Sequence, residues 1–105
     1  MKPMKLGEVI AERKLVAMKG RKKVEIVVKL GRPVRFDGGP GFRCPIQIKG
    51  IGDEKVTFAA GEDSMQALHL ALKTIGIELF LRHKDYQFSW LDQPDAGFIR
   101  PSVGE

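Results

Sequence analysis

A period-two pattern of apolar residues predicts half-buried β-strands in two segments of the chain. Residues 23–30 alternate with a period of two, and residues 42–49 do the same. The apolar residues that follow this period are Val24, Ile26, Val28, Leu30, Phe42, Cys44, Ile46 and Ile48. Each strand therefore turns one face toward a core.

A third strand is predicted upstream, over residues 9–17, where the alternation is less regular. A two-residue turn at Gly20-Arg21 makes it a hairpin with residues 23–30, because glycine suits the first position of a mirror-type turn. The predicted pairs on the apolar face are Ala17–Val24, Leu15–Ile26 and Ala11–Leu30. Arg13, opposite Val28, is the charged exception on that face, and its long side chain can reach the edge of the sheet.

A fourth strand is predicted at residues 56–60, after the turn Gly52-Asp53-Glu54. A three-residue loop pairs Ile48 with Phe58 and Ile46 with Ala60, which keeps the apolar positions on one face. The glycine-rich segment 31–41 is a connection in which Val34 and Phe36 can extend the sheet.

Residues 64–83 carry the pattern of one long helix. Asp63 and Gln66 form a capping pair at its start. Two apolar stripes lie on nearly opposite sides of this helix. The first consists of Leu68, Leu72, Ile75 and Leu79, and the second consists of Leu70, Ile77 and Leu81. The sheet covers the first stripe, and the second needs another cover, either the segment Tyr86–Leu91 or another subunit.

The elements together predict an α+β fold, an antiparallel meander of about four strands packed against one long helix, with a C-terminal segment whose placement the pattern leaves open. The chain has 105 residues, which is the size of one domain. We assign residues 1–92 to this domain and residues 93–105 to a short, polar, loosely ordered tail.

Cysteine content and hydropathy indicate the cellular compartment in which the protein is expected. A single cysteine excludes an internal disulfide, and no apolar stretch has the length of a signal peptide or a membrane span. We therefore expect a cytoplasmic protein without a membrane partner.

Charge points to a second type of partner. The net charge is +5 and the pI about 9.6. The residues expected to form a polyanion-binding surface on the outward face of the sheet are Lys23, Lys29, Arg43, Lys49 and Lys55. Sheets that read RNA also expose aromatic side chains for base stacking, whereas the alternation turns Phe42 and Phe58 inward. Nucleic-acid binding is therefore the alternative, not the leading, hypothesis.

Residue types that carry catalysis are present but not grouped. Cys44 falls on the apolar face, where burial raises a thiol pKa. His69 and His83 lie 14 positions apart on one helix, about 21 Å at the helical rise, so they do not share a metal. The Gly38–Gly41 segment lacks the Gly-Lys-Ser/Thr ending of a phosphate-binding loop. We expect no enzyme activity, no cofactor and no metal.

Residues 44–53 and 66–76, with Ile10-Ala11-Glu12-Arg13 and Ser89-Trp90-Leu91, resemble a small bacterial domain family of unknown function. The resemblance covers about residues 10–91 and implies no activity. A second, fainter resemblance is to HicB-type antitoxins, and it is carried by Gly61-Glu62-Asp63-Ser64 followed by an Ala-Leu-rich helix. That likeness implies binding of a partner toxin through a small sheet and a helix.

The sequence therefore favours a non-enzymatic protein-association module. Its association surface is the second helix stripe, Leu70, Ile77 and Leu81, and its partner is another protein or a second copy in a homodimer. The alternatives are a nucleic-acid-binding domain that uses the basic sheet face, or a HicB-like antitoxin component.

Overall fold

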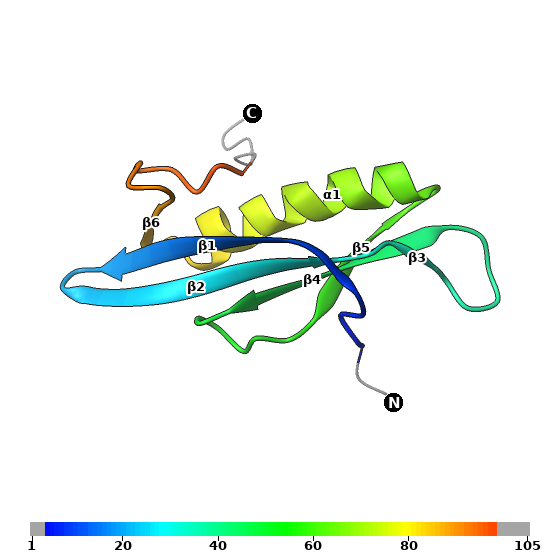
Figure 1. Cartoon of the computed structure of the whole chain (residues 1–105), viewed down its shortest axis with the longest axis horizontal. Coiled ribbons are helices and arrows are strands. Elements are labelled where there is room, and N and C mark those ends of the chain that lie inside the picture. The colour runs from blue at the N-terminus through cyan, green and yellow to red at the C-terminus, as the bar shows by residue number, and fades with distance from the viewer. Residues whose placement is uncertain (1–3, 99–105) are drawn as a thin grey trace.

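The computed structural model, described over residues 4–98, is an antiparallel sheet with one helix, which confirms the α+β class (Figure 1). The strands are β1 (Val9–Lys19), β2 (Lys22–Gly31), β3 (Val34–Arg35), β4 (Phe42–Lys49), β5 (Thr57–Gly61) and β6 (Gln87–Ser89). The helix α1 (Ser64–Ile77) continues into a π-helical turn, Glu78–Arg82. Six strands replace the predicted four, because β3 and β6 are too short to show an alternation.

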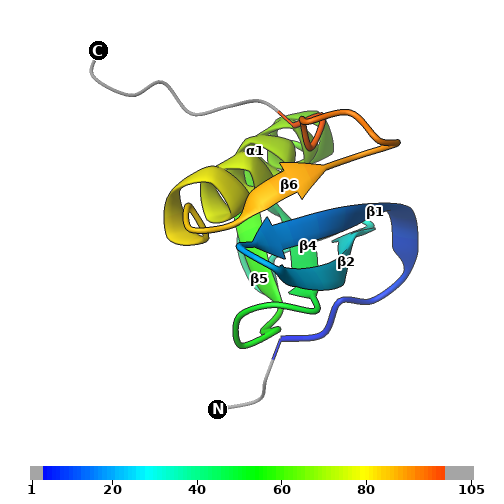
Figure 2. The ribbon, with the colours of Figure 1, turned by 90° about the vertical axis from the view of Figure 1, so that its left-hand side faces the viewer.

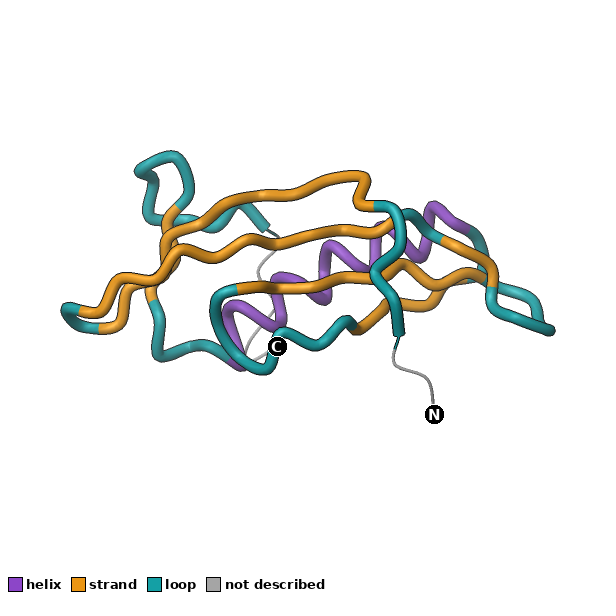
Figure 3. Tube along the Cα trace, turned by 60° about the horizontal axis from the view of Figure 1, so that its bottom comes forward, coloured by secondary structure: helices purple, strands orange, loops and turns teal. Residues whose placement is uncertain are grey.

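The strands lie in the order β5-β4-β2-β1-β6, with β3 beside β4. α1 covers one face of this sheet, which we call the inner face, and we call the opposite face the outer face (Figure 3). The N-terminal segment crosses the outer face at Gly31, where the Leu6 carbonyl leaves no room for a side chain. The absence of a side chain at Gly31 therefore lets the N-terminal segment pass directly over β2.

The β1–β2 hairpin has the predicted register. Ala17 pairs with Val24, Leu15 with Ile26 and Ala11 with Leu30. Gly20 has a φ of +59° at the first position of the turn, as a mirror-type hairpin turn requires. The buried apolar residues of the two strands lie on the inner face, and they are Leu15, Ala17, Ile26, Val28 and Leu30.

The predicted β4–β5 register is wrong. Ile46 pairs with Thr57 rather than Ala60, and Cys44 pairs with Ala59. The loop is longer than three residues, because Glu54 closes it: its carboxylate accepts from the Gly50 amide at 2.7 Å. Phe58 consequently lies on the outer face, and the smaller Ala59 lies inside.

Small residues bring α1 close to the sheet. Ala67 and Ala71 are fully buried against it, and Gly61 of β5 lies so close to Ala67 that a Cβ there would collide with its backbone. The capping prediction is confirmed, because Asp63 accepts a hydrogen bond from the Gln66 amide at 2.8 Å. The Gln66 side chain in turn accepts from the Glu62 amide at 2.6 Å.

The C-terminal segment returns to the sheet as β6, beside β1. Phe88 of β6 pairs with Ala17 and is buried. After a tight turn at Leu91-Asp92 the chain doubles back, and Ala96 is fully buried. The packed part of the chain thus extends past residue 92 as far as residue 98; the rest of the predicted tail, residues 99–105, lies outside the described residues.

One further property concerns membranes. Within residues 4–98, no helix is both long enough and apolar enough to cross a bilayer.

Candidate functional site

The second apolar stripe of the helix, which we call the α1 stripe, lies partly in solvent and consists of Leu70, Ile77 and Leu81. Leu70 is half-buried at the margin of the core. Ile77 is 41% exposed and Leu81, in the π-helical turn, is 44% exposed. Two large aliphatic side chains about one turn apart therefore form an apolar ridge on a regular element.

The segment expected as one possible cover lies on a different flank of the helix. Figure 2 shows β6 and the chain after it beside α1, on the side of β1. There Phe88 meets Phe80 edge-to-face, with ring centroids 6.4 Å apart, and Phe98 lines a groove with Leu72 and Ile75. Within residues 4–98, no packing buries Ile77 or Leu81.

Arg13 holds the C-terminal segment on that flank. Its guanidinium donates to the carbonyl oxygens of Ala96 at 3.2 Å and Gly97 at 3.1 Å. The same group lies over the ring of Trp90, 3.7 Å from the centroid, and 4.9 Å from that of Phe98. The alternation showed Arg13 as the charged exception on the apolar face of the predicted strand. It predicted that the side chain reaches the edge of the sheet, but it did not predict these contacts.

Four of the five predicted polyanion-binding residues lie on the outer face of the sheet. These residues are Lys23, Lys29, Arg43 and Lys49. Lys55 is apart from them, in the loop between β4 and β5. Glu12 stands opposite Lys29, and the crossing at Gly31 separates Lys29 from Arg43. The basic surface is therefore interrupted by an acidic side chain and by the N-terminal segment.

The prediction that Phe58 points inward is wrong, because the β4–β5 register differs from the expected one. Phe58 is 40% exposed on the outer face and meets Phe36 edge-to-face, with centroids 5.7 Å apart. The Arg43 guanidinium lies 5.7 Å from the centroid of Phe36. Phe42 is half-buried and packs against the core. An aromatic and basic cluster thus exists at the β3–β5 end of the outer face.

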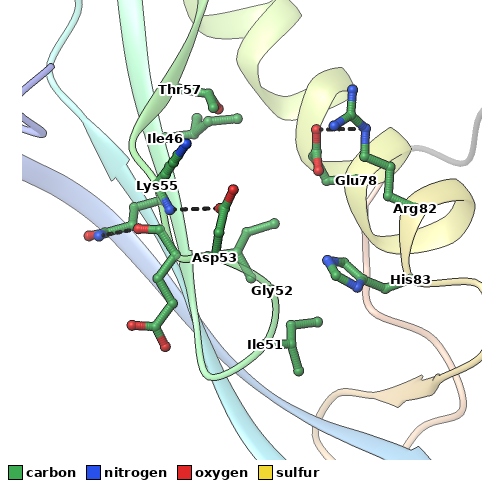
Figure 4. Close-up of a pocket in the computed structure, with 12 residues that line it drawn as sticks. Ile46, Ile51, Gly52, Asp53, Lys55, Thr57, Glu78, Arg82 and His83 are labelled. Atoms are coloured by element: carbon green, nitrogen blue, oxygen red, sulfur yellow. Dashed lines mark hydrogen bonds and ion pairs between the residues drawn. The ribbon is translucent and has the colours of Figure 1, made fainter. Parts of the chain in front are cut away.

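A small cleft lies between the β4–β5 loop and the π-helical turn (Figure 4). Asp53 and Lys55 reach it from the loop, and His83 reaches it from the end of the helix, where its ring packs on Gly52. Glu78 and Arg82 form an ion pair at 3.4 Å on its wall. Its volume of about 120 Å³ is well below the roughly 300 Å³ at which small-molecule pockets begin.

Cys44 is buried, as the alternation predicts. Its Sγ donates to the Gly31 carbonyl at 3.4 Å, and desolvation by burial raises the pKa of the thiol. His69 is exposed, whereas His83 is half-buried against Tyr86. Over the described residues, no three His, Cys, Asp or Glu side chains come together in a way that could hold a metal ion.

These features define a small α+β domain whose open surfaces are an apolar helix ridge and a mixed basic and aromatic sheet face. Residues 11–101 match the family model described as a domain of unknown function, DUF6968, and the chain belongs to that family. No curated protein and no solved structure matches the chain significantly. The family match provides no link to HicB-type antitoxins.

Proposed function

We propose that this domain is a non-enzymatic protein-association module and that its docking surface is the α1 stripe. The observation that carries the proposal is the exposure of Ile77 and Leu81 on a helix whose opposite flank is already covered. Contiguous exposed apolar side chains on a regular element are typical of association surfaces.

The burial of Cys44 also supports this proposal. Its raised pKa disfavours the thiolate, the form needed for nucleophilic attack. The fixed position of the C-terminal segment supports it further, because Arg13 keeps that segment away from the stripe.

Site-specific photo-cross-linking in the cells that make the protein tests the proposal. A photoreactive amino acid replaces Ile77, and in a control it replaces His69, an exposed residue elsewhere on α1. We expect an adduct from position 77 and none from position 69. Equal labelling from both positions, or no adduct from position 77, would contradict the association module.

A second candidate function, nucleic-acid binding, is favoured by one observation. Phe58 and Phe36 lie on the same face of the sheet as Arg43, so a stacked base and a phosphate could be held together. Fluorescence anisotropy with labelled single-stranded oligouridylate at low salt tests it. Binding that Phe58→Ala weakens about 10-fold would support this function, and absence of binding would exclude it.

A further inference from the structure

The outer edge of β5 lacks the usual protection of an edge strand. Natural edges carry charges, prolines or bulges that prevent pairing with other chains. The β1 edge has such features: a bulge near Val9, the charged Arg13 and Lys14, and partial cover by β6. β5 reads Thr-Phe-Ala-Ala-Gly, and over residues 4–98 no strand pairs with its outer edge.

The register shows which β5 backbone groups face outward. In antiparallel pairs, hydrogen-bonded and non-bonded residues alternate, and the hairpin turn at Gly20-Arg21 sets the phase. The β2–β4 and β4–β5 pairs continue this alternation from strand to strand. As a result, the backbone N–H and C=O groups of Thr57, Ala59 and Gly61 point toward β4. The N–H and C=O groups of Phe58 and Ala60 therefore point away from the sheet, ready to pair with another strand.

The α1 stripe lies on the same side of the molecule as this edge. α1 packs over β5 and β4: Gly61 lies against Ala67, and Thr57 shares a cleft with Glu78. The flank of α1 that faces β1 and β6 carries Leu72 and Phe80. Helical spacing directs the stripe away from that flank, toward the side on which β5 is the last strand of the sheet.

We propose that the β5 edge and the α1 stripe form one interface and that its occupant is a second copy of this chain. This inference rests on the proposed function and specifies its partner. An antiparallel β5–β5 pair with its twofold axis at Ala59 sets Phe58 of each copy opposite Ala60 of the other. The large ring lies over the small side chain at both positions, so the edge is complementary to itself.

The same axis matches the helices. The contacts of Gly61 with Ala67 and of Thr57 with the cleft at Glu78 place the middle of α1 level with Ala59. A twofold axis there sets Leu70 of one copy against Ile77 of the other. A single operation therefore pairs the open backbone groups of β5 and covers the apolar ridge of α1, which an unrelated partner would have to match separately.

A register-specific disulfide tests this geometry in the full chain. Directly opposite hydrogen-bonded residues have Cα atoms about 5.5 Å apart, within the range of a disulfide. We expect Phe58→Cys protein mixed with Ala60→Cys protein to form a disulfide-linked dimer under mild oxidation. Either variant alone should not, because its cysteines are offset by two residues. Cys44 is buried on the other face of the sheet and does not compete.

Ala60→Lys, with Ile10→Lys on the β1 edge as the matched control, tests the same contact in solution. Size-exclusion chromatography of the purified full chain should show a dimer that Ala60→Lys weakens about 10-fold or more, whereas Ile10→Lys leaves it unchanged. Equal effects of the two lysines, or no mixed disulfide, would overturn the β5 pairing. A monomeric chain that still cross-links to another protein from position 77 would overturn this inference and leave the association module standing. A monomer without any adduct from position 77 would overturn both.

Discussion

At the residue scale, Arg13 shows how one side chain determines which flank of the helix stays open. It is a charged side chain in the middle of the apolar face of β1, and it satisfies its charge with two carbonyl oxygens and two aromatic rings. Each of these four partners belongs to residues 90–98. The segment is thereby fixed on the β1 side of α1, and the α1 stripe stays exposed.

Replacing Arg13 should loosen this segment. Arg13→Met keeps the length of the side chain but removes the charge-assisted hydrogen bonds and the cation–π contact with Trp90, so we expect a free energy of unfolding about 1–3 kcal/mol lower. Arg21→Met, in the exposed hairpin turn, is the control and should change it by less than about 0.5 kcal/mol. Urea unfolding followed by Trp90 fluorescence measures both variants; equal stability of the two would show that Arg13 does not anchor the segment.

At the scale of elements, the distance between α1 and β5 depends on small residues. Gly61 of β5 is in contact with the backbone of Ala67, and Ala59, two residues earlier on the same face, is buried in the core. This close approach keeps α1 above the free edge. It also explains why Ala59, not Phe58, is the inward-facing residue.

Adding one methyl group at this contact should separate the two elements. Gly61→Ala forces its Cβ against the Ala67 amide, and we expect about 1–3 kcal/mol of destabilisation. Gly39→Ala is the control, because its new Cβ would meet nothing within 4 Å and its φ lies outside the left-handed region. Thermal unfolding should separate the two variants clearly. A Gly61→Ala protein as stable as Gly39→Ala would mean that α1 does not press on β5.

The ion pair between Lys19, the last residue of β1, and Asp85, just before β6, gives a dependence on pH. Lys19 donates a hydrogen bond of 2.9 Å to the Asp85 carboxylate. This bond lowers the pKa of the Asp85 carboxyl and raises the pKa of the Lys19 ammonium. The stabilisation from Asp85 is therefore complete above the ordinary carboxyl pKa of about 3.9 and is lost as the pH falls through the lowered one.

We accordingly expect Asp85→Asn to melt slightly below the wild type at pH 7 and at the same temperature at about pH 2. The difference is small because both side chains are more than half exposed. Asp37→Asn, in the exposed β3–β4 loop, should match the wild type at both values. A deficit of Asp85→Asn that persists at pH 2 would show that the charge is not its source.

The two hairpins explain why one register was predictable and the other was not. A two-residue turn leaves one way to keep Leu15 and Ile26 on the same face, so the β1–β2 pairing follows from the sequence. The β4–β5 loop is longer, and a side-chain contact from Glu54 determines its closure, which no alternation reveals. The apolar pattern in β5 predicted that Phe58 faces the core. In the structure the helix lies so close to β5 that the small Ala59 takes the inward position.

At the scale of the whole molecule, the two sides of the sheet differ. The β1 side is closed by β6, by Arg13 and by the segment up to residue 98, whereas the β5 side has an open edge below an open apolar ridge. The sequence predicted the ridge residues from helical spacing alone. It could not predict which flank the C-terminal segment covers, because that depends on a strand of three residues and on contacts 83 and 84 positions apart.

Sedimentation equilibrium of the purified chain tests the central claim, that the α1 stripe is the interface of a homodimer. At micromolar concentrations we expect a wild-type mass of twice 11.7 kDa. Ile77→Lys should reduce it to the monomer mass without unfolding, because Ile77 is already part-exposed. Met65→Lys, on the same helix and 76% exposed but outside the stripe, should stay dimeric. A monomeric wild type, or the same mass for Ile77→Lys and Met65→Lys, would contradict the account.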